Sequence, residues 1–157
     1  MSPTEKKPTN NSVLMTEIVL PSHANVHGTI FGGVIMSWID IAGAIAAARH
    51  SRSAVVTVSL DSLHFIAPVK VGYTVLVHAS VTYAGSTSME VEIFVEAENS
   101  LTGDVKRATT AFLTYVAVDE FGRPRQVPPF TPKTALEKKK HKEAAERRKI
   151  RLRAKSG

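Results

Sequence analysis

The 157-residue sequence predicts an α+β domain in which one long helix is buried against the concave face of an antiparallel sheet. Residues 30–50 form a proline-free run that is apolar on nearly every face. Such a helix must be covered by protein or by lipid. Four strand-like segments follow it, and short turns join the last three of them, which favours an antiparallel meander.

The chain before the helix predicts one strand and one loop. Residues 12–20 are rich in β-forming residues and should form the first strand, which Pro21 ends. Residues 22–29 form a polar loop that leads into the helix. Two glycines open the helix and two basic residues close it, as the helix dipole favours.

A transmembrane helix is the alternative for residues 30–50, because the apolar run is about long enough to cross a bilayer. Asp40 would then lie near the bilayer centre, at a cost of about 3 kcal/mol. The amphipathic strands that follow offer a sheet to cover the helix. We therefore favour a helix buried in protein.

The remaining strands are predicted at residues 54–65, 74–84, 87–98 and 106–118. In the second of these, one face should carry Val75, Val77, Ala79, Val81 and Tyr83. The third alternates most clearly, with one apolar face formed by Met89, Val91, Ile93, Val95 and Ala97. Its other face carries Glu90, Glu92, Glu96 and Glu98, which we expect to face solvent or a partner.

The composition divides the chain into a flexible N-terminus (residues 1–11), one folded domain (residues 12–132) and a basic tail (residues 133–157). The tail carries eleven Lys or Arg against three Glu, whereas the rest of the chain has a net charge of −2. The basic pI of 9.7 therefore belongs to the tail. Nucleic-acid binding by the whole protein loses its main support, although weak tail contacts with RNA or acidic partners stay open.

The tail itself is predicted as a solvated helix or a disordered segment. Thr134 and Glu137 have the spacing of a capping box, and the residues after them favour helix. Large apolar residues are few in the tail and form no stripe. A dedicated anion-binding arm is the alternative.

The sequence contains no cysteine, which excludes disulfides, a thiol nucleophile and thiolate metal ligands. No histidine pair has metal-ligand spacing on the predicted helix, so we predict no metal site. The first twelve residues lack the apolar core of a signal peptide. We therefore expect a cytoplasmic enzyme or binding protein.

Five residues around the helix could carry chemistry. Asp40 is a carboxylate within an apolar helix, and its structural alternative is a pairing or capping role. Gly32 and Gly33 offer free N–H groups at the helix start, as an oxyanion hole requires, or they form a tight loop. Asn25 could bind a carbonyl or a water, and His27 could act as a base or bond only to backbone.

These residues also carry a resemblance to a known family. The segment ANVHGTIFGGVIMSWIDIAGAIAAARH resembles the helix motif of hotdog-fold acyl-CoA thioesterases, among them bacterial YciA-type enzymes and cytosolic, brain-type acyl-CoA hydrolases. HFIAPVKVGYTV resembles the family's connection between strands, and TTAFLTYVAVDEFGRPRQVP resembles its C-terminal strand. The resemblance covers about residues 12–129 and leaves the tail outside.

The resemblance implies a hotdog fold, in which a five-stranded antiparallel sheet wraps round the central helix. It further implies a homodimer with a continuous ten-stranded sheet, often assembled into a hexamer as a trimer of dimers. The substrate would be an acyl-CoA, and coenzyme A would enter only as part of substrate and product, with no other cofactor.

The resemblance also implies roles for individual residues. Asp40 would be the general base or nucleophile, and Asn25, from the opposite subunit, would position the water or the carbonyl. The N–H of Gly33, with that of Gly32, would polarise the carbonyl. Further candidate substrate-binding residues are His27, Arg49, Arg52, Thr57, Gly85, Ser86, Thr87 and Ser88.

The resulting prediction is an acyl-CoA thioesterase. One alternative is another hotdog protein, either a dehydratase or a non-catalytic acyl-CoA sensor. A dehydratase of this fold would be expected to use a histidine paired with an acid, and no such pair is apparent in the helix. The other alternative is a nucleic-acid binder that acts through the tail.

Overall fold

The computed structural model describes residues 12–156, so the flexible N-terminus predicted for residues 1–11 lies outside the described residues. The elements follow the predicted order, with boundaries that differ by two residues or fewer. They are β1 (Val13–Ile18), η1 (Pro21–His23), α1 (Gly32–Ser51), β2 (Ala54–Phe65), β3 (Thr74–Ala84), β4 (Ser88–Glu98), β5 (Val105–Val118) and α2 (Ala135–Ser156).

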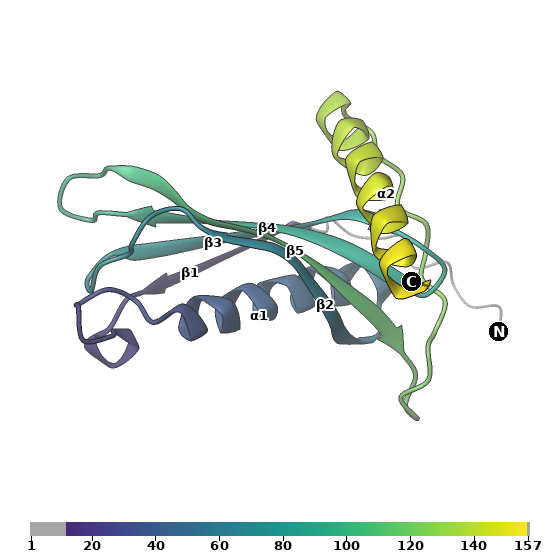
Figure 1. Cartoon of the computed structure of the whole chain (residues 1–157), viewed down its shortest axis with the longest axis horizontal. Helices are drawn as coiled ribbons and strands as arrows, with labels where there is room; N and C mark the ends of the chain where they lie inside the picture. The colour runs from purple at the N-terminus through teal and green to yellow at the C-terminus, as the bar shows by residue number, and fades with distance from the viewer. Residues whose placement is uncertain (1–11, 157) are drawn as a thin grey trace.

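The five strands form one antiparallel sheet in the order β1-β3-β4-β5-β2. The expected meander of β3, β4 and β5 is confirmed, and the chain reaches β2 at one edge of the sheet. Helix α1 lies along one face of the sheet, which curves over it (Figure 1). The hotdog arrangement that the resemblance implies is therefore confirmed.

The core lies between α1 and the inner face of the sheet. Every apolar residue that alternates on β4 is buried, and each is at most 7% exposed: Met89, Val91, Ile93, Val95 and Ala97. Helix α1 contributes its own buried face, formed by Ile35, Trp38, Ile39, Ala42, Gly43, Ala46 and Ala47. Each large apolar side chain buried there stabilises the fold by about 2 kcal/mol, so α1 is held by the sheet.

The alternation predicted for β3 is wrong at its end. The β3–β4 register shifts between Val81 and Tyr83, and Tyr83 pairs with Glu90 on the outer face. The extra residue, Thr82, is buried and donates a hydrogen bond to Glu90. Because a bulge reverses the faces of the residues that follow it, Tyr83 lies outside the core.

Helix α1 also passes the length and composition test for a membrane span, alone among the helices of residues 12–156. The position of α1 in the fold shows that protein covers it rather than lipid. Nine of its residues are buried inside the protein, and they line the face that packs on the sheet. A core helix meets the same test as a membrane span, and α1 is such a helix.

The opposite face of α1 is apolar but uncovered within one chain. Met36, Ile41 and Ile45 are 41%, 50% and 37% exposed. The inner face of the edge strand β2 adds Leu60, which pairs with Leu113 and is 40% exposed. Exposed apolar side chains grouped in this way mark an interaction site, and these lie beside an unpaired sheet edge.

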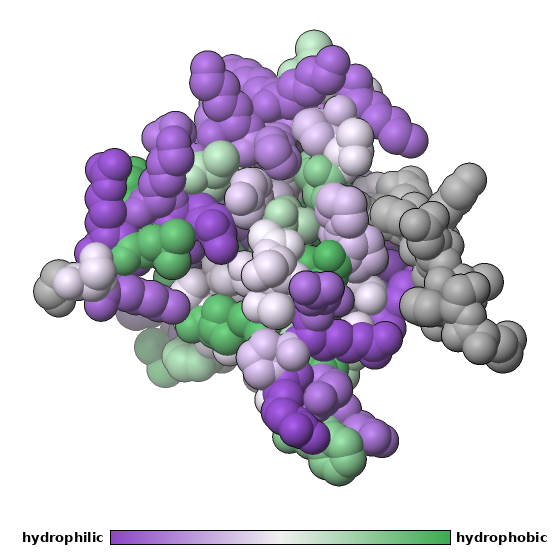
Figure 2. All heavy atoms as spheres, turned by 90° about the vertical axis from the view of Figure 1, so that its right-hand side faces the viewer, coloured by the Kyte–Doolittle hydropathy of each residue, from purple (hydrophilic) through white to green (hydrophobic). Residues whose placement is uncertain are grey.

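The basic tail forms helix α2, which crosses the outer face of the sheet, opposite α1 (Figure 1). Hydrophilic side chains gather where α2 lies, at the top of the view in Figure 2. The predicted helix is present, with Ala144 as its buried residue, but it is not surrounded by solvent, because one side of it contacts the sheet through polar groups. The contact between α2 and the sheet was not predicted, because the face of α2 that makes it is charged and has no apolar stripe.

Candidate active site

Asp40 lies half-buried on α1, beside the uncovered apolar face. Its Oδ1 accepts a hydrogen bond of 2.7 Å from the Thr57 hydroxyl and one of 3.0 Å from the Tyr115 hydroxyl. Among the described residues, no hydrogen bond reaches its second oxygen, Oδ2. Asp40 is therefore neither sealed in the core nor paired with a cation, and one oxygen stays available.

Thr57 and Tyr115 reach Asp40 from the sheet. They are partners across the β2–β5 ladder and share its inner face. Thr57 is one of the predicted substrate-binding residues, and the structure assigns it a contact with the carboxylate. Tyr115 was missed, although its register opposite Thr57 would have placed it there once the pairing of β2 with β5 was known.

The predicted oxyanion hole lies at the start of α1. No side chain of the N-cap residue caps the first turn, so the N–H groups of Gly32 and Gly33 are donors without an acceptor in the helix, as is usual at a helix start. A Cβ on Gly33 would lie 2.7 Å from a ring carbon of Phe31, which gives this glycine a packing role as well. Asp40 lies about 10 Å further along the same helix, two turns away.

Asn25 closes a turn within the loop before α1. Its Oδ1 accepts hydrogen bonds of 2.9 Å and 3.3 Å from the N–H groups of His27 and Thr29, and its Nδ2 donates to the Thr29 hydroxyl at 2.9 Å. His27 is exposed and contributes its backbone to this turn. The structure thus brings Asn25 and His27 together but leaves both away from Asp40 in the same chain.

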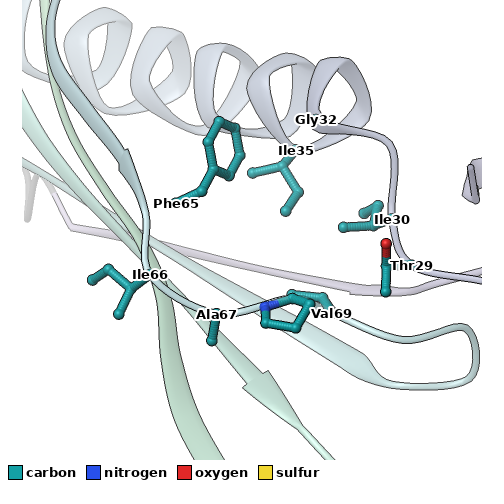
Figure 3. A pocket seen from close by; sticks show the side chains of 9 residues that line it. Thr29, Ile30, Gly32, Ile35, Phe65, Ile66, Ala67 and Val69 are labelled. Atoms are coloured by element: carbon teal, nitrogen blue, oxygen red, sulfur yellow. The ribbon is translucent and has the colours of Figure 1, made fainter. Parts of the chain in front are cut away.

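An apolar cavity of about 310 Å³ opens beside the start of α1, where Phe65 and Ile35 point toward it (Figure 3). It is bounded by the first turn of α1 and by the segment after β2. Its lining residues are Thr29, Ile30, Gly32, Ile35, Phe65, Ile66, Ala67, Pro68 and Val69. The cavity can take an apolar chain, and it adjoins the free N–H groups of the helix start.

The remaining predicted substrate-binding residues lie at the other end of the fold. Arg49 and Arg52 are at the end of α1, about 13 Å or more from Asp40 along the helix axis. The turn formed by Gly85, Ser86, Thr87 and Ser88 joins β3 to β4 at the same end of the sheet. Arg148 of α2 lies over this turn, 3.3 Å from where a Cβ on Gly85 would stand.

No group of three or more acidic or histidine side chains within residues 12–156 is arranged to hold a metal ion. The acid–histidine contact of the sheet, between Glu96 and His78 at 2.6 Å, lies on the outer face. There His78 stacks on Phe94. This pair is therefore separated from Asp40 by the sheet.

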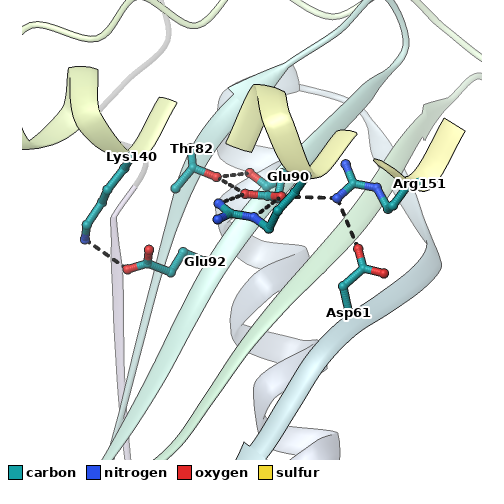
Figure 4. A network of polar contacts seen from close by, with 7 residues as sticks. Asp61, Thr82, Glu90, Glu92, Lys140 and Arg151 are labelled. Atoms are coloured by element: carbon teal, nitrogen blue, oxygen red, sulfur yellow. Dashed lines mark hydrogen bonds and ion pairs between the residues drawn. The ribbon is translucent and has the colours of Figure 1, made fainter. Parts of the chain in front are cut away.

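A second polar cluster joins α2 to the outer face and centres on Glu90 (Figure 4). Glu90 is 1% exposed, and Arg147 binds it with two hydrogen bonds of 2.8 Å and 3.0 Å. Arg151 and Thr82 add bonds of 3.2 Å and 2.7 Å. Burial alone would raise the pKa of Glu90, but the bonds from Arg147 and Thr82 hold it below its usual value.

Two further ion pairs fix the same helix. Lys140 binds Glu92 at 2.9 Å, and Arg151 also binds Asp61 of β2 at 3.1 Å. Of the four glutamates expected to face solvent or a partner, Glu90 and Glu92 therefore contact α2 of their own chain, and Glu96 contacts His78. The basic side chains of α2 that face the sheet thus hold the helix in place. Those on its other side remain on the surface.

Comparison with known proteins gives a consistent result. The thioesterase superfamily matches residues 27–103 of this chain. An uncharacterized acyl-CoA thioester hydrolase of Bacillus subtilis, YkhA, is 42% identical over 137 residues, which cover 87% of this chain and 80% of that protein.

Solved structures agree in fold and sequence. An apo-hexameric acyl-CoA thioesterase superposes with a TM-score of 0.90 at 40% identity, covering 94% of this chain and 95% of that one. An acyl-CoA hydrolase from Staphylococcus aureus, in complex with butyryl coenzyme A and coenzyme A, gives 0.85 at 35% identity, covering 96% and 94%. That hydrolase was also solved with an aspartate, a threonine or an asparagine replaced by alanine.

The Glu90 cluster predicts how α2 responds to substitution and to pH. Arg147→Ala should lower the free energy of unfolding by about 3 kcal/mol at pH 7, because a buried carboxylate loses its main partner. Since the pKa of Glu90 lies below its usual 4.5 in the folded protein, the ion pair contributes above that pH and is lost on acidification. The difference from wild type should therefore shrink below about pH 4.5.

Urea unfolding curves at several pH values measure this difference. Lys149→Ala is the matched control, because Lys149 pairs with Glu146 while both side chains are more than 60% exposed. It should change stability by less than about 0.5 kcal/mol. An Arg147→Ala protein as stable as the control would contradict the assigned role of the cluster.

Proposed function

This chain belongs to the thioesterase superfamily, among the acyl-CoA thioester hydrolases, and from that premise we propose that it hydrolyses an acyl-CoA to the free acid and coenzyme A. The observation that carries the proposal is the carboxylate of Asp40. It lies at the edge of an apolar surface, Thr57 holds one of its oxygens, and no cation within residues 12–156 neutralises it. Such a carboxylate is suited to act as a base.

The reaction needs one carboxylate, one water and a set of donors. Asp40 takes a proton from water through Oδ2 while the water oxygen attacks the thioester carbonyl. The N–H groups of Gly33 and Gly32 stabilise the tetrahedral oxyanion. The C–S bond then breaks, the free acid forms, and Asp40 returns its proton to the leaving thiolate. If Asp40 acts as nucleophile instead, a mixed anhydride precedes attack by water.

Two copies of the chain are required by this assignment. Asp40 and the N–H of Gly33 are about 10 Å apart within one helix, too far to act on one carbonyl. Two α1 helices packed antiparallel through their uncovered faces would bring Asp40 of one copy beside Asn25 and Gly33 of the other. Pairing of the two β2 edges would also cover Val56 and Val58 and extend the sheet to ten strands.

Further association and the ends of the substrate complete the proposal. The hexameric state of one solved relative supports a trimer of dimers.

The acyl chain would enter the cavity beside Phe65 and Ile35. The nucleotide end would bind basic and loop donors, for which the candidates are Arg49, Arg52, Gly85, Ser86, Thr87 and Ser88. The proposal includes no metal or added cofactor, and it includes a cytoplasmic location, as for the cytosolic enzymes that the motifs resemble.

Replacing the carboxylate tests the function directly. Asp40→Asn keeps the shape of the side chain but removes the base, so kcat should fall by about a hundredfold or more. The measurement is thiol release from a panel of acyl-CoA substrates. Asp104→Asn, in the exposed turn between β4 and β5, is the matched control. Full activity of Asp40→Asn would refute the mechanism, and acyl-CoA binding without turnover by the wild type would indicate a sensor.

Asn25 has a loop contact and a proposed catalytic contact, and one substitution separates them. Asn25→Asp keeps an oxygen that accepts from the N–H groups of His27 and Thr29 and from the Thr29 hydroxyl, but it removes the amide donor. We expect an unchanged unfolding midpoint and a kcat/KM about a hundredfold lower, as for loss of an oxyanion donor. Asn25→Ala, which loses both contacts, should also unfold earlier. Normal activity of Asn25→Asp would reduce Asn25 to a loop-closing residue.

The proposed dimer predicts that a charge on the uncovered face of α1 abolishes both assembly and activity. Ile45→Glu should yield monomers, because the interface would have to bury an unpaired carboxylate from each copy. Light scattering after size exclusion measures the mass. Leu101→Glu, at a β4–β5 turn position that is 97% exposed, should stay assembled and active. A monomeric but fully active Ile45→Glu protein would refute the two-chain site.

A further inference from the structure

Tyr115 is a buried polar residue that the proposed reaction leaves without a role. It comes from the middle of β5 and is 0% exposed. Its hydroxyl lies 3.0 Å from Oδ1 of Asp40 and 3.0 Å from the backbone carbonyl oxygen of the same residue. A buried hydroxyl needs a partner, and both acceptors of this one belong to Asp40.

Helix α1 is shaped to admit this tyrosine. Gly43 lies three residues after Asp40, directly against the phenol. A Cβ at position 43 would stand 2.9 Å from Cζ of Tyr115 and closer still to its hydroxyl oxygen. Ile93 closes the same space from β4, at 3.0 Å from that Cβ. Glycine disfavours helix, and here its missing side chain is what lets the hydroxyl reach Asp40.

We propose that Tyr115 is a positioning residue for the reaction: together with Thr57 it holds Oδ1 of Asp40, so that Oδ2 is presented to the substrate. This inference rests on the proposed role of Asp40. The two hydroxyls approach Oδ1 from neighbouring strands, β5 and β2. With both donors on Oδ1, the carboxylate cannot rotate to exchange its oxygens without breaking two hydrogen bonds.

The tyrosine stays a donor throughout the working pH range. Burial raises the pKa of Tyr115, and the negative charge of Asp40 raises it further. The neutral hydroxyl therefore donates to the carboxylate and does not compete for the proton that Asp40 takes from water.

The position of Tyr115 predicts an effect on turnover rather than on binding. Its hydroxyl contacts Asp40 from the sheet side, whereas the substrate would approach Oδ2 from the uncovered side of α1. Tyr115→Phe removes the hydroxyl and keeps the ring. We expect kcat to fall about tenfold, as for one hydrogen bond to a charged group, with KM for acyl-CoA unchanged within about twofold.

If Tyr115 only stabilised the fold, a Tyr115→Phe protein that remains folded would keep the wild-type kcat. Tyr73→Phe is the matched control, because the Tyr73 hydroxyl accepts from Asn99 at the far end of β3. Tyr73→Phe should keep the wild-type kcat. Gly43→Ala is a second variant, and its methyl group should displace the ring and lower kcat at least as much as Tyr115→Phe. Thermal melts identify any variant that fails to fold.

The outcomes separate this inference from the proposed function. If Asp40→Asn is inactive while Tyr115→Phe keeps the wild-type kcat, Tyr115 has no positioning role and the thioesterase mechanism stands. If Tyr115→Phe raises KM and leaves kcat unchanged, Tyr115 acts on binding and the inference is overturned. If Asp40→Asn is fully active, the proposed function fails and the inference fails with it.

Discussion

The structure depends on one constraint, which is that helix α1 is apolar on both sides. The sheet covers one side, and the contact between that side and the sheet forms the core. The other side remains open within a single chain, beside the edge strand β2. Because Asp40 lies beside this open side, the candidate site and the surface proposed for a second copy are the same region. In the proposed dimer, folding and assembly therefore determine the environment of the carboxylate together.

Glu90 and Asp40 have opposite environments. Glu90 is bound by Arg147 and Arg151, so its charge is neutralised and used to fix α2 on the sheet. Asp40 is held by two neutral hydroxyls, which orient it without cancelling its charge. The same fold thus contains a structural carboxylate on the outer face and, on the inner face, the carboxylate that we propose to be reactive. The sheet between them keeps the arginines away from Asp40.

Sequence periodicity was sufficient for the strands and the helix, because each buries one apolar face. The β4 glutamates and valines were assigned correctly for that reason. What the sequence could not reveal depends on register between distant segments. The bulge at Thr82 reverses Tyr83, the arginines of α2 meet Glu90 across more than fifty residues, and Tyr115 meets Asp40 across 75. The turn closed by Asn25 is local, but its side chain could equally have faced a substrate.

The glycine opposite Tyr115 also sets the rotation of α1. Successive helical positions are about 100° apart, so a slip of one residue would turn the helix and present the methyl group of Ala42 or Ala44 to the phenol. Only position 43 lacks the methyl group that would collide there. The contact between Gly43 and Tyr115 therefore sets the rotation and the axial position of α1 on the sheet. It thereby fixes where every side chain of α1 lies relative to β2.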